Sequence, residues 1–461
     1  MMKKKDHKCI FVIGGVMSGV GKGVAVSSIG KILQSKGLSV NLVKIDPYLN
    51  VDAGTMNPTE HGETFVLRSG LETDQDMGNY ERFLDTNLSR LNYMTTGRIY
   101  QTVISNERNL MYKGKCVQVV PHIPQEAIKR IKRAAQKANA DITVIEIGGT
   151  VGEYENILFL EAGRMMKVDN PDDVAFVMVS YLPIPKKVGE MKTKPTQHAV
   201  RTANQAGIQP DIIIARSETP IDKKRKEKIA TFCNVDPKQV ISAPDVDSIY
   251  DIPINFERSH LGDILLERLN MDAAVNRKSR MDSWRKFAKR ANSLKKEVKI
   301  AIVGKYFGTG DFVLSDSYIS VIEAIKYSAY HLGKKPILTW LNASDFEVNG
   351  NALSKAEIAK NLRGLEKYDG VLVPGGFGER GIEGKLNVIE YVRTHKIPYF
   401  GLCYGMQLLV IEYARNILKL NNATTNEISK DAEHLIIDIM PDQKEKLLEK
   451  EYGAWVLIQL Y

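Results

Sequence analysis

Short apolar runs rich in β-branched residues alternate along the chain with longer stretches in which apolar residues recur every three or four positions. Short continuous apolar runs predict buried strands, and the periodic stretches between them predict helices. In the first half we expect strands at Cys9–Ile13, Ser39–Lys44, Asp141–Ile147, Val174–Tyr181, Asp211–Ala215 and Val240–Ser242. Strands that alternate with helices are typical of an α/β fold, in which crossover helices cover a parallel sheet.

The pattern changes at Met271–Lys296, where Lys and Arg are frequent and apolar residues are sparse. We interpret this stretch as a partly helical linker. The alternation then resumes with one helix and three strands, at Ser315–His331, Val298–Val303, Gly370–Val373 and Pro398–Gly401. Because 461 residues exceed one ordinary core, we predict a domain at 1–270, a linker at 271–296 and a second α/β domain at 297–461.

Composition and charge narrow the class of protein. The chain is 43% hydrophobic and 26% charged, as globular proteins are, and no apolar run approaches the roughly 18 residues that span a membrane. Its cysteines are isolated, which argues against a disulfide framework or a zinc site. Sixty-four basic residues against 55 acidic ones give a net charge of +9, which phosphorylated small substrates explain better than a polynucleotide. We therefore expect a cytoplasmic protein that binds neither membrane nor nucleic acid.

A glycine-rich loop, Gly14–Gly23, follows the first predicted strand, and the apolar spacing after it predicts a helix. In this context backbone N–H groups and the helix N-terminus face a phosphate, and Lys22 reaches the outer phosphates. The loop differs from the standard pattern in two ways. Five residues rather than four separate Gly15 from Gly21, and Gly23 stands where a Ser or Thr normally binds magnesium. A purely structural glycine turn is the alternative.

Without that hydroxyl, Mg²⁺ needs oxygen ligands from elsewhere in the chain. Glu146 ends a mostly apolar predicted strand, so it should lie at the ligand-binding edge of a parallel sheet. Asp76 lies in the acidic turn Glu72–Asp76, which alone could be a solvated loop. We predict that Asp76 and Glu146 bind the metal ion.

The second domain contains a candidate nucleophile. Gly401-Leu402-Cys403-Tyr404-Gly405 joins a predicted strand to a predicted helix, which is the pattern of a nucleophile elbow. The glycines permit the tight turn, and the helix N-terminus favours the thiolate of Cys403. Upstream, Pro374–Gly381 follows another strand and can offer backbone N–H groups as an oxyanion hole. A buried structural cysteine is the alternative. Both segments resemble a class I glutamine amidotransferase domain.

From about residue 9 to 427 the chain resembles the CTP synthase family. The resemblance is carried by the glycine loop and the acidic turn, and by Lys44–Asp52, Gly54–Met56, His61–Glu63, Thr96–Tyr100, Gln118–Ile123, Glu146–Gly152, Lys192–His198, Gly207–Asp211 and Asp245–Tyr250. It implies a ligase of pyrimidine biosynthesis in which ATP phosphorylates the 4-oxygen of UTP. Ammonia, taken from glutamine, then displaces the phosphate and yields CTP.

The resemblance also implies the roles of particular residues. Lys22 and Cys403 would be catalytic. ATP would contact Gly19, Val20, Gly21, Lys22, Gly23, Val24, Lys44, Asp76, Asp245 and Val246. UTP or CTP would contact Ser18, Glu153, Tyr154, Glu155, Lys192, Thr193, Lys194, Pro195, Thr196, Gln197 and Lys228. Glutamine would contact Gly376, Tyr404, Gly405, Met406, Gln407 and Glu427.

Further expectations follow from the same resemblance. Mg²⁺ would be the cofactor, GTP an allosteric activator and CTP a feedback inhibitor, and the protein would form a homotetramer. The cytidine ring would be sensed at Glu153 and Glu155, although Glu153 replaces an Asp of the family. The end of the chain also departs from the family pattern, in which a His with a Glu two residues later activates the cysteine, so we expect the second domain to be incomplete at its C-terminus. Here His434 is the one later histidine, so we expect glutamine use to be impaired or absent, with free ammonia still accepted.

Two other functions stay open. A partition-type switch ATPase would carry an additional Lys early in the loop and a Ser or Thr after the second Lys, and Val16–Gly23 has neither. A non-catalytic or filament-forming remnant of a CTP synthase is the other possibility.

Overall fold

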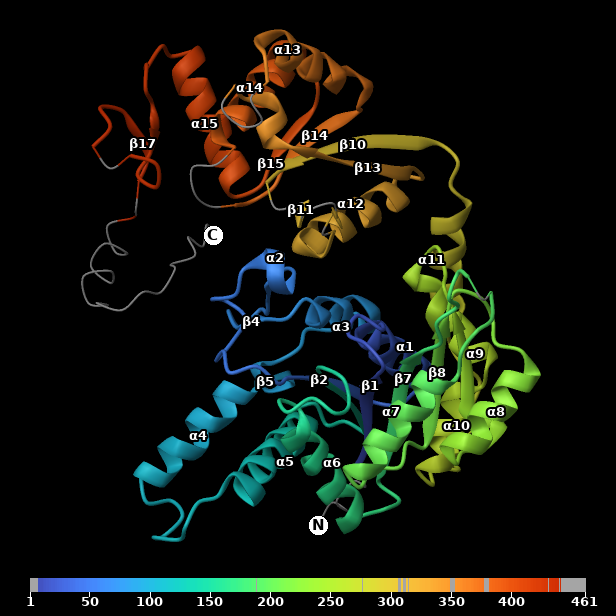
Figure 1. The fold of residues 1–461 in the computed structure, drawn as a ribbon. Coiled ribbons are helices and arrows are strands. Elements are labelled where there is room, and N and C mark those ends of the chain that lie inside the picture. Colours follow the sequence, from blue (N-terminus) through green and yellow to red (C-terminus); the bar gives the residue numbers. More distant parts are fainter. Residues whose placement is uncertain are drawn as a thin grey trace. The chain divides into compact units, whose positions relative to one another are not determined.

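The computed structural model describes residues 7–187, 189–275, 277–305, 308–309, 312–313, 315–348, 353–376, 381–429, 431–438 and 440. The chain divides into two compact units (Figure 1). The first contains Met1–Gly54 and Thr64–Lys289, and the second contains Thr55–Glu63 and Arg290–Tyr461. The division after Lys289 falls inside the stretch that we interpret as a linker, and within helix α11 (Asp282–Ser293).

A parallel sheet organises the first unit. Among the described residues its seven strands have the order β5-β2-β6-β1-β7-β8-β9, and every pairing is parallel. The strands are β1 (Lys8–Gly15), β2 (Val40–Asp46), β5 (Tyr93–Thr95), β6 (Ile142–Ile147), β7 (Val174–Tyr181), β8 (Ile212–Ser217) and β9 (Val240–Pro244). The prediction of strands in the first half is therefore confirmed at six positions, and the short β5 was missed.

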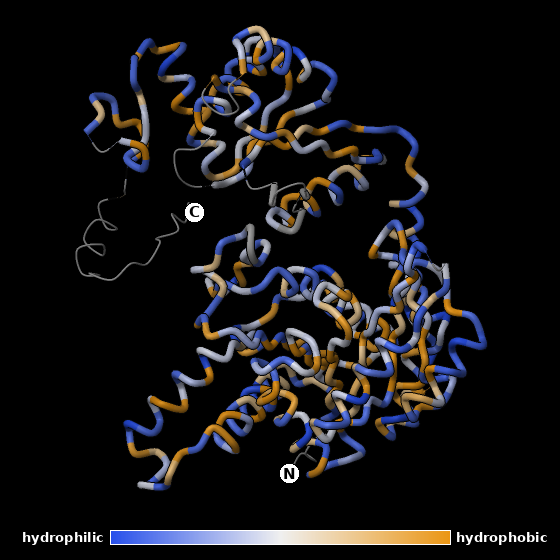
Figure 2. The backbone as a smooth tube through the Cα atoms, in the orientation of Figure 1, coloured by the Kyte–Doolittle hydropathy of each residue, from blue (hydrophilic) through white to orange (hydrophobic). Residues whose placement is uncertain are grey.

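Helices cover both faces of this sheet because side chains along a strand alternate between the faces. Phe11 and Ile13 of β1 pack among α4 (Thr96–Arg108), α5 (Val119–Lys137), α6 (Ile157–Asp169), α7 (Lys194–Gln205) and α8 (Lys223–Cys233). Ile10 and Val12 pack among α1 (Lys22–Ser35), α3 (Asp76–Leu84), α9 (Ile252–Arg258) and α10 (Leu261–Arg268). Figure 2 shows the mainly hydrophilic course of α8 and α11 at the periphery of this unit. A hairpin of β3 (Phe65–Val66) and β4 (Glu72–Thr73) precedes α3.

The second unit has a smaller parallel sheet. Its described strands have the order β13-β10-β14-β15, formed by β10 (Glu297–Gly304), β13 (Lys335–Asn342), β14 (Gly370–Val373) and β15 (Tyr399–Gly401). The helices are α12 (Ile319–His331), α13 (Lys355–Arg363), α14 (Ile382–Thr394) and α15 (Tyr404–Asn416). Two-residue strands β11 (Gly308–Thr309) and β12 (Phe312–Val313), a one-turn helix α2 (Pro58–His61), β16 (Thr424–Thr425) and β17 (Leu435–Ile437) complete it.

The α/β class with parallel sheets is thus confirmed, with two local differences in the second unit. The residues before Ile319 form a 3₁₀ turn, Ser315–Tyr318, so the predicted helix is α-helical from Ile319. The edge strand β13 was missed because its side chains are only partly buried and carry no clean apolar run. No helix in the described ranges has the length and apolar character needed to cross a membrane.

Candidate functional site

The glycine loop joins β1 to α1 at the edge where the parallel strands of the first unit end. Gly19 and Gly21 have φ of 69° and 87°, in the left-handed region that favours glycine. Gly21 immediately precedes α1, and Val20 is buried beneath the loop, while Ser18 is exposed. The predicted order of strand, glycine loop and helix is present, and it is the arrangement that receives phosphate groups.

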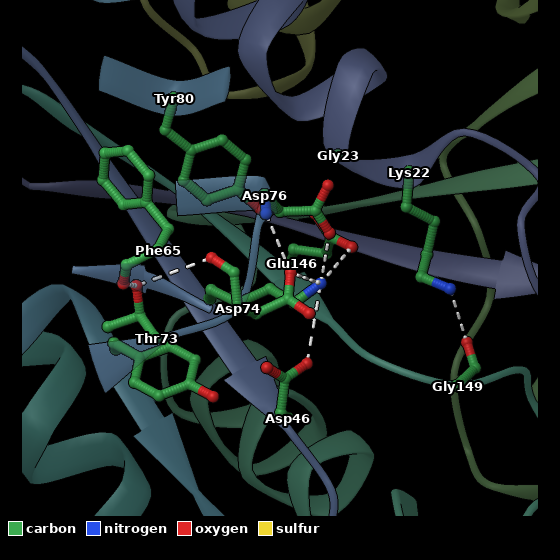
Figure 3. Close-up of polar contacts among 12 residues, drawn as sticks. Lys22, Gly23, Asp46, Phe65, Thr73, Asp74, Asp76, Tyr80, Glu146 and Gly149 are labelled. Atoms are coloured by element: carbon green, nitrogen blue, oxygen red, sulfur yellow. Dashed lines mark hydrogen bonds and ion pairs between the residues drawn. The ribbon is translucent and has the colours of Figure 1, made fainter. Parts of the chain in front are cut away.

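Lys22, the first residue of α1, crosses to the loop that follows β6. Its Nζ donates a hydrogen bond to the carbonyl oxygen of Gly149 at 2.7 Å (Figure 3). Burial lowers the pKa of Lys22, and the Glu146 carboxylate opposes this shift. The ammonium group is therefore held at the sheet edge by a neutral carbonyl, and among the described residues it has no acidic partner that a phosphate would have to displace.

Gly23 and the Asp76 side chain lie in close contact at the start of α1. A Cβ atom built on Gly23 would lie 1.9 Å from Oδ1 of Asp76 and 2.5 Å from its carboxyl carbon. The Asp76 carboxylate, at the first turn of α3, therefore fills the space that a Ser or Thr side chain would need. The hydroxyl missing from the loop is replaced in space by a carboxylate from a different helix.

Lys44, on β2, lies at the centre of a buried acidic cluster. Its Nζ is 2.5 Å from Oδ2 of Asp76, 3.0 Å from Oε1 of Glu146, 3.5 Å from Oδ1 of Asp46 and 3.6 Å from Oδ1 of Asp74. Figure 3 shows these carboxylates converging from the ends of β2 and β6 and the start of α3. The structure thus brings together three predicted residues, Lys44, Asp76 and Glu146. Asp46 and Asp74 were not predicted as site residues, although both lie within the sequence blocks that carry the resemblance.

Burial and mutual repulsion set the charges of this acidic cluster. Burial raises the pKa of Asp74 to about 7 and also raises the pKa of Asp46. Burial and then Asp76 raise the pKa of Glu146, whose other oxygen accepts a hydrogen bond from Tyr80. At Asp76 burial is outweighed by Lys44, so its pKa lies below the ordinary value. Burial lowers the pKa of Lys44, but the four carboxylates overcome this effect and keep it well above its usual range.

The donor set suits a magnesium ion that also binds phosphate. Within the described ranges, no group of three or more His, Cys, Asp and Glu side chains is arranged as a complete metal site. Mg²⁺ is commonly held by one or two carboxylates, with water and substrate phosphates as its other ligands. Asp76 and Glu146 are two carboxylates that already share one cation, the Lys44 ammonium. When all four acids are ionised, their charge of −4 and the +2 of Lys22 and Lys44 leave −2, the complement of one divalent cation.

Predicted ATP contacts also meet on the far side of the loop. Asp245 and Val246 line a cavity of about 600 Å³, together with Asn255 and Arg258. Gly21 and Val24 line an adjoining apolar hollow with Arg216, Pro244 and Phe256. Arg216 joins the two because its Nη2 lies 2.6 Å from Oδ1 of Asp245. Arg216 and Asn255 were missed, since neither carries a sequence motif of its own.

A basic cluster lies between the β7–α7 loop and α8. Nζ of Lys192 is 2.6 Å from Oε2 of Glu190, and Nη2 of Arg225 is 3.7 Å from Oε1 of the same residue. The Lys192 hydrogen bond, with further help from Arg225 and Lys228, keeps the pKa of Glu190 below its usual range. The structure therefore brings two predicted residues, Lys192 and Lys228, near one carboxylate and adds Arg225, which was not predicted.

The rest of the Lys192–Gln197 block is built into the start of α7. Pro195 lies in the first turn, as its missing N–H allows, and Lys194 is exposed. Oγ1 of Thr196 is hydrogen-bonded to Oγ of Ser180 at 2.7 Å, and Nε2 of Gln197 donates to Oγ1 of Thr193 at 3.1 Å. These hydrogen bonds hold the segment at the start of α7, which carries Lys192 and Lys194.

The residues predicted to sense cytidine differ in their surroundings. The Glu153 carboxylate accepts hydrogen bonds from the backbone N–H of Thr150 at 2.9 Å and from its hydroxyl at 2.6 Å. Glu153 therefore braces the loop that also supplies the Gly149 carbonyl to Lys22. Tyr154 and Glu155 are exposed beside it.

Cys403 lies in the predicted nucleophile elbow. Its backbone has φ 51° and ψ −107°, and α15 begins at the next residue. A Cβ on Gly401 would lie 2.5 Å from the carbonyl carbon of Gly405, and one on Gly405 would lie 2.1 Å from the carbonyl oxygen of Val373. Both glycines are therefore required by the close approach of backbone segments. Burial raises the pKa of Cys403, and the N–H of Tyr404 at the start of α15 opposes this shift in the expected direction without cancelling it.

The predicted glutamine contacts cluster around this elbow. Gly405 accepts a hydrogen bond from the Tyr399 hydroxyl at 2.8 Å, while Gln407 is buried and Met406 is partly exposed. Gly376 follows β14, but residues 377–380 of the predicted oxyanion loop lie outside the described residues. Glu427, after β16, donates its N–H to Oγ1 of Thr425 at 3.2 Å. The His434 imidazole pairs with the adjacent Glu433, at 4.0 Å.

Lys385 of α14 is buried beside this elbow, with 1% of its surface exposed. In the part of the chain that the structure describes, its Nζ has no hydrogen-bond partner and lies 5.5 Å from the centre of the Tyr404 ring. Burial, and then Lys305, lower the pKa of Lys385 to about 8. A protonated amine in this position costs folding free energy.

We expect Lys385→Met to raise the free energy of unfolding at pH 7 by roughly 1–3 kcal/mol. Below pH 8 Lys385 is protonated in both the folded and the unfolded wild type, so the full cost of burying its charge lowers the free energy of unfolding. Between about pH 8 and the ordinary lysine pKa of 10.5 the unfolded state retains the proton that the folded state has lost, so wild-type stability rises with pH there. Denaturant titrations across this range should show that slope in the wild type and in Lys360→Met, an exposed control, and its loss in Lys385→Met. An unchanged slope in Lys385→Met would refute the assignment.

Comparisons with known proteins cover both units. The family model for the CTP synthase N-terminus matches residues 8–271, and that for class-I glutamine amidotransferase matches residues 313–448. Proteins named CTP synthase from Bacillus cytotoxicus and Bacillus licheniformis are each 45% identical over 455 residues, which is 98% of this chain and 81% of the relative. One from Listeria innocua is 44% identical over 438 residues, 95% of this chain and 79% of the relative.

Among solved structures, the glutaminase domain of Trypanosoma brucei CTPS with bound acivicin is 31% identical. That match covers 32% of this chain and 53% of the other, with a TM-score of 0.29. Two family models match the chain, and relatives named CTP synthase align with it over nearly its whole length. A glycine loop completed by an acidic edge and a separate cysteine elbow agree with those matches. The chain belongs to the CTP synthase family.

Proposed function

We propose that this chain converts UTP to CTP at the expense of ATP, with nitrogen entering as ammonia. The observation that carries the proposal is the Asp76 carboxylate in the space beside Gly23, next to Glu146 and Lys22. A phosphate loop with its own acidic edge is suited to phosphoryl transfer, in which positioning and charge neutralisation account for most of the catalysis.

Each residue of this edge has a distinct proposed role. Lys22, held by a neutral carbonyl, is available to bind the transferring phosphoryl group as negative charge develops on it. Asp76 and Glu146 would hold Mg²⁺, which when bound neutralises phosphate oxygens. Arg216 and Asp245 would border the ATP base between the two adjoining hollows. Once the Lys44 ammonium separates from the carboxylates, it would bind the nucleotide phosphates.

The basic cluster beside α7 is the proposed site for the triphosphate of UTP. Lys192, Arg225 and Lys228 provide positive charge that Glu190 only partly balances. CTP would compete at the same place, which provides feedback inhibition. Glu153 would act through the loop that it braces, because its carboxylate is already bonded to Thr150.

The second unit is the proposed glutaminase region, and we expect it to release ammonia from glutamine poorly or not at all, so that free ammonia supplies the nitrogen. Cys403 would be the nucleophile, with Gly376, Tyr404–Gln407 and Glu427 around the glutamine, and GTP would act as an activator. Subunit association into a homotetramer is supported by exposed apolar side chains on and after α4, namely Ile104 at 57%, Leu110 at 72% and Met111 at 68% exposure.

Nucleotide turnover separates this function from its alternatives. We expect ATP hydrolysis to require both UTP and ammonium chloride and to yield CTP in equal amount, detected by chromatography. A switch ATPase would hydrolyse ATP without UTP, and a non-catalytic remnant would show no turnover in either condition. Replacing ammonium by glutamine tests the second unit, because Cys403→Ala should abolish any glutamine-driven reaction and leave the ammonia-driven one intact.

A further inference from the structure

Lys44 occupies the position between the two carboxylates that are proposed to bind magnesium. Its Nζ is hydrogen-bonded to Asp76 at 2.5 Å and to Glu146 at 3.0 Å, and its side chain is 6% exposed. An ammonium group and a divalent cation cannot share these oxygens, because the two positive charges would lie within a few ångströms in a poorly solvated site. Metal binding therefore requires Lys44 to move.

The surroundings offer Lys44 other partners. Asp46 and Asp74 are 3.5 and 3.6 Å from its Nζ, so a small shift towards them retains its charge balance while Asp76 and Glu146 become free. Nucleotide phosphates at the adjacent loop would offer a further partner. Lys22 differs because its ammonium is bonded to the Gly149 carbonyl and to no carboxylate of the described chain within ion-pair distance.

We propose that Lys44 acts as a placeholder cation, which keeps the affinity of the empty site for free divalent cations low and couples metal binding to nucleotide binding. This inference rests on the proposed function, since it assumes that Asp76 and Glu146 are the metal ligands. Its consequence is a positive coupling: phosphates that attract Lys44 improve the metal site, and metal that displaces Lys44 improves phosphate binding. Lys44 is thus a positioning residue that determines when the metal site opens.

Binding of Mn²⁺ in the absence of nucleotide tests this role. Titrations followed by electron paramagnetic resonance would compare the wild type with Lys44→Met, Lys44→Gln and Lys22→Met. We expect both Lys44 variants to bind Mn²⁺ at least about tenfold more tightly than the wild type. Lys22→Met removes the same charge from the same edge without freeing a carboxylate, so its gain should be much smaller.

The outcomes separate the inference from the proposed function. Equal Mn²⁺ affinity in the wild type and both Lys44 variants would overturn the placeholder role, as would an equal gain in Lys22→Met, which would reduce the effect to net charge. Adding Asp76→Asn to Lys44→Gln should abolish the gain. If the gain survives in that double variant, the proposed metal ligands are wrong as well.

Folding of the variants is monitored separately. Removing Lys44 leaves three buried carboxylates and the partly buried Asp76 without their central cation, so we expect a lower melting temperature that Mn²⁺ restores. Circular dichroism and thermal melting with and without Mn²⁺ would show this rescue in Lys44→Gln and a much smaller shift in the wild type. A destabilised Lys44→Gln that Mn²⁺ does not rescue would also contradict the inference.

Discussion

Gly23→Ser should nearly abolish CTP formation, even though it restores the residue that a standard phosphate loop carries. Its Cβ would lie 1.9 Å from Oδ1 of Asp76, so either the carboxylate or the start of α1 must move by an ångström or more. Misplacement of that size at a reacting centre costs about a hundredfold or more in rate. We expect the ammonia-driven kcat to fall by at least that factor, measured at saturating ATP and UTP.

The cause of this loss can be isolated. Gly364→Ser is a control for the substitution itself, because a Cβ there meets no atom within 4 Å. Adding Asp76→Ala to Gly23→Ser should recover the melting temperature, since the clash is gone, but should not recover turnover, since the carboxylate is gone too. Activity of Gly23→Ser within tenfold of the wild type would show that the loop accommodates a side chain and that the replacement of the hydroxyl by Asp76 is incidental.

Lys22→Met should strongly lower the rate of CTP formation while leaving the fold intact. The Lys22 ammonium is bonded to a carbonyl and, in the part of the chain that the structure describes, to no carboxylate. Loss of a group that stabilises charge in the transition state typically costs a hundredfold to a thousandfold in rate. Burial already lowers the pKa of Lys22, so an apolar side chain of similar length should not destabilise the protein. We expect kcat to fall by roughly that factor at an unchanged melting temperature.

Lys31→Met provides the matched control. Lys31 lies on the same helix, and its ammonium is 5.3 Å from the centre of the Trp284 ring. We expect this variant to retain wild-type turnover. If Lys22→Met raises KM for ATP but leaves kcat unchanged, Lys22 binds the ground state and transition state equally, and its catalytic role is wrong.

The sequence predicted the architecture well where burial is complete on both faces of a strand. β1 and β7 contain continuous apolar runs and β6 a mostly apolar one, and all three are covered on both sides, so their pattern is unambiguous. β13 escaped prediction because an edge strand needs no such run. It begins at Lys335, ends at Asn342 and contains Thr339. The three-residue β5 offers too few positions for any periodicity.

The candidate site could be predicted only in part. Lys22, Lys44, Asp76 and Glu146 were predicted from the motif and the resemblance. No local pattern, however, predicts that the Asp76 carboxylate fills the space where a side chain at Gly23 would lie. That relation depends on the packing of α3 against α1, which is a tertiary property. Arg216 and Arg225 were missed for the same reason, because each becomes a site residue only through a partner on another element.

Because Asp76 fills the space beside Gly23, the site also depends on the packing of α3 against α1. Met77, Tyr80 and Leu84 of α3 are buried in the same core as Val26 and Ile29 of α1, so the carboxylate is in place only while the two helices are packed together. A transient local opening of α3 would dismantle the acidic edge without unfolding the sheet. Occupancy of the site should therefore suppress that opening, and slower amide hydrogen exchange along α3 would report ligand binding from a helix that carries no part of the glycine loop.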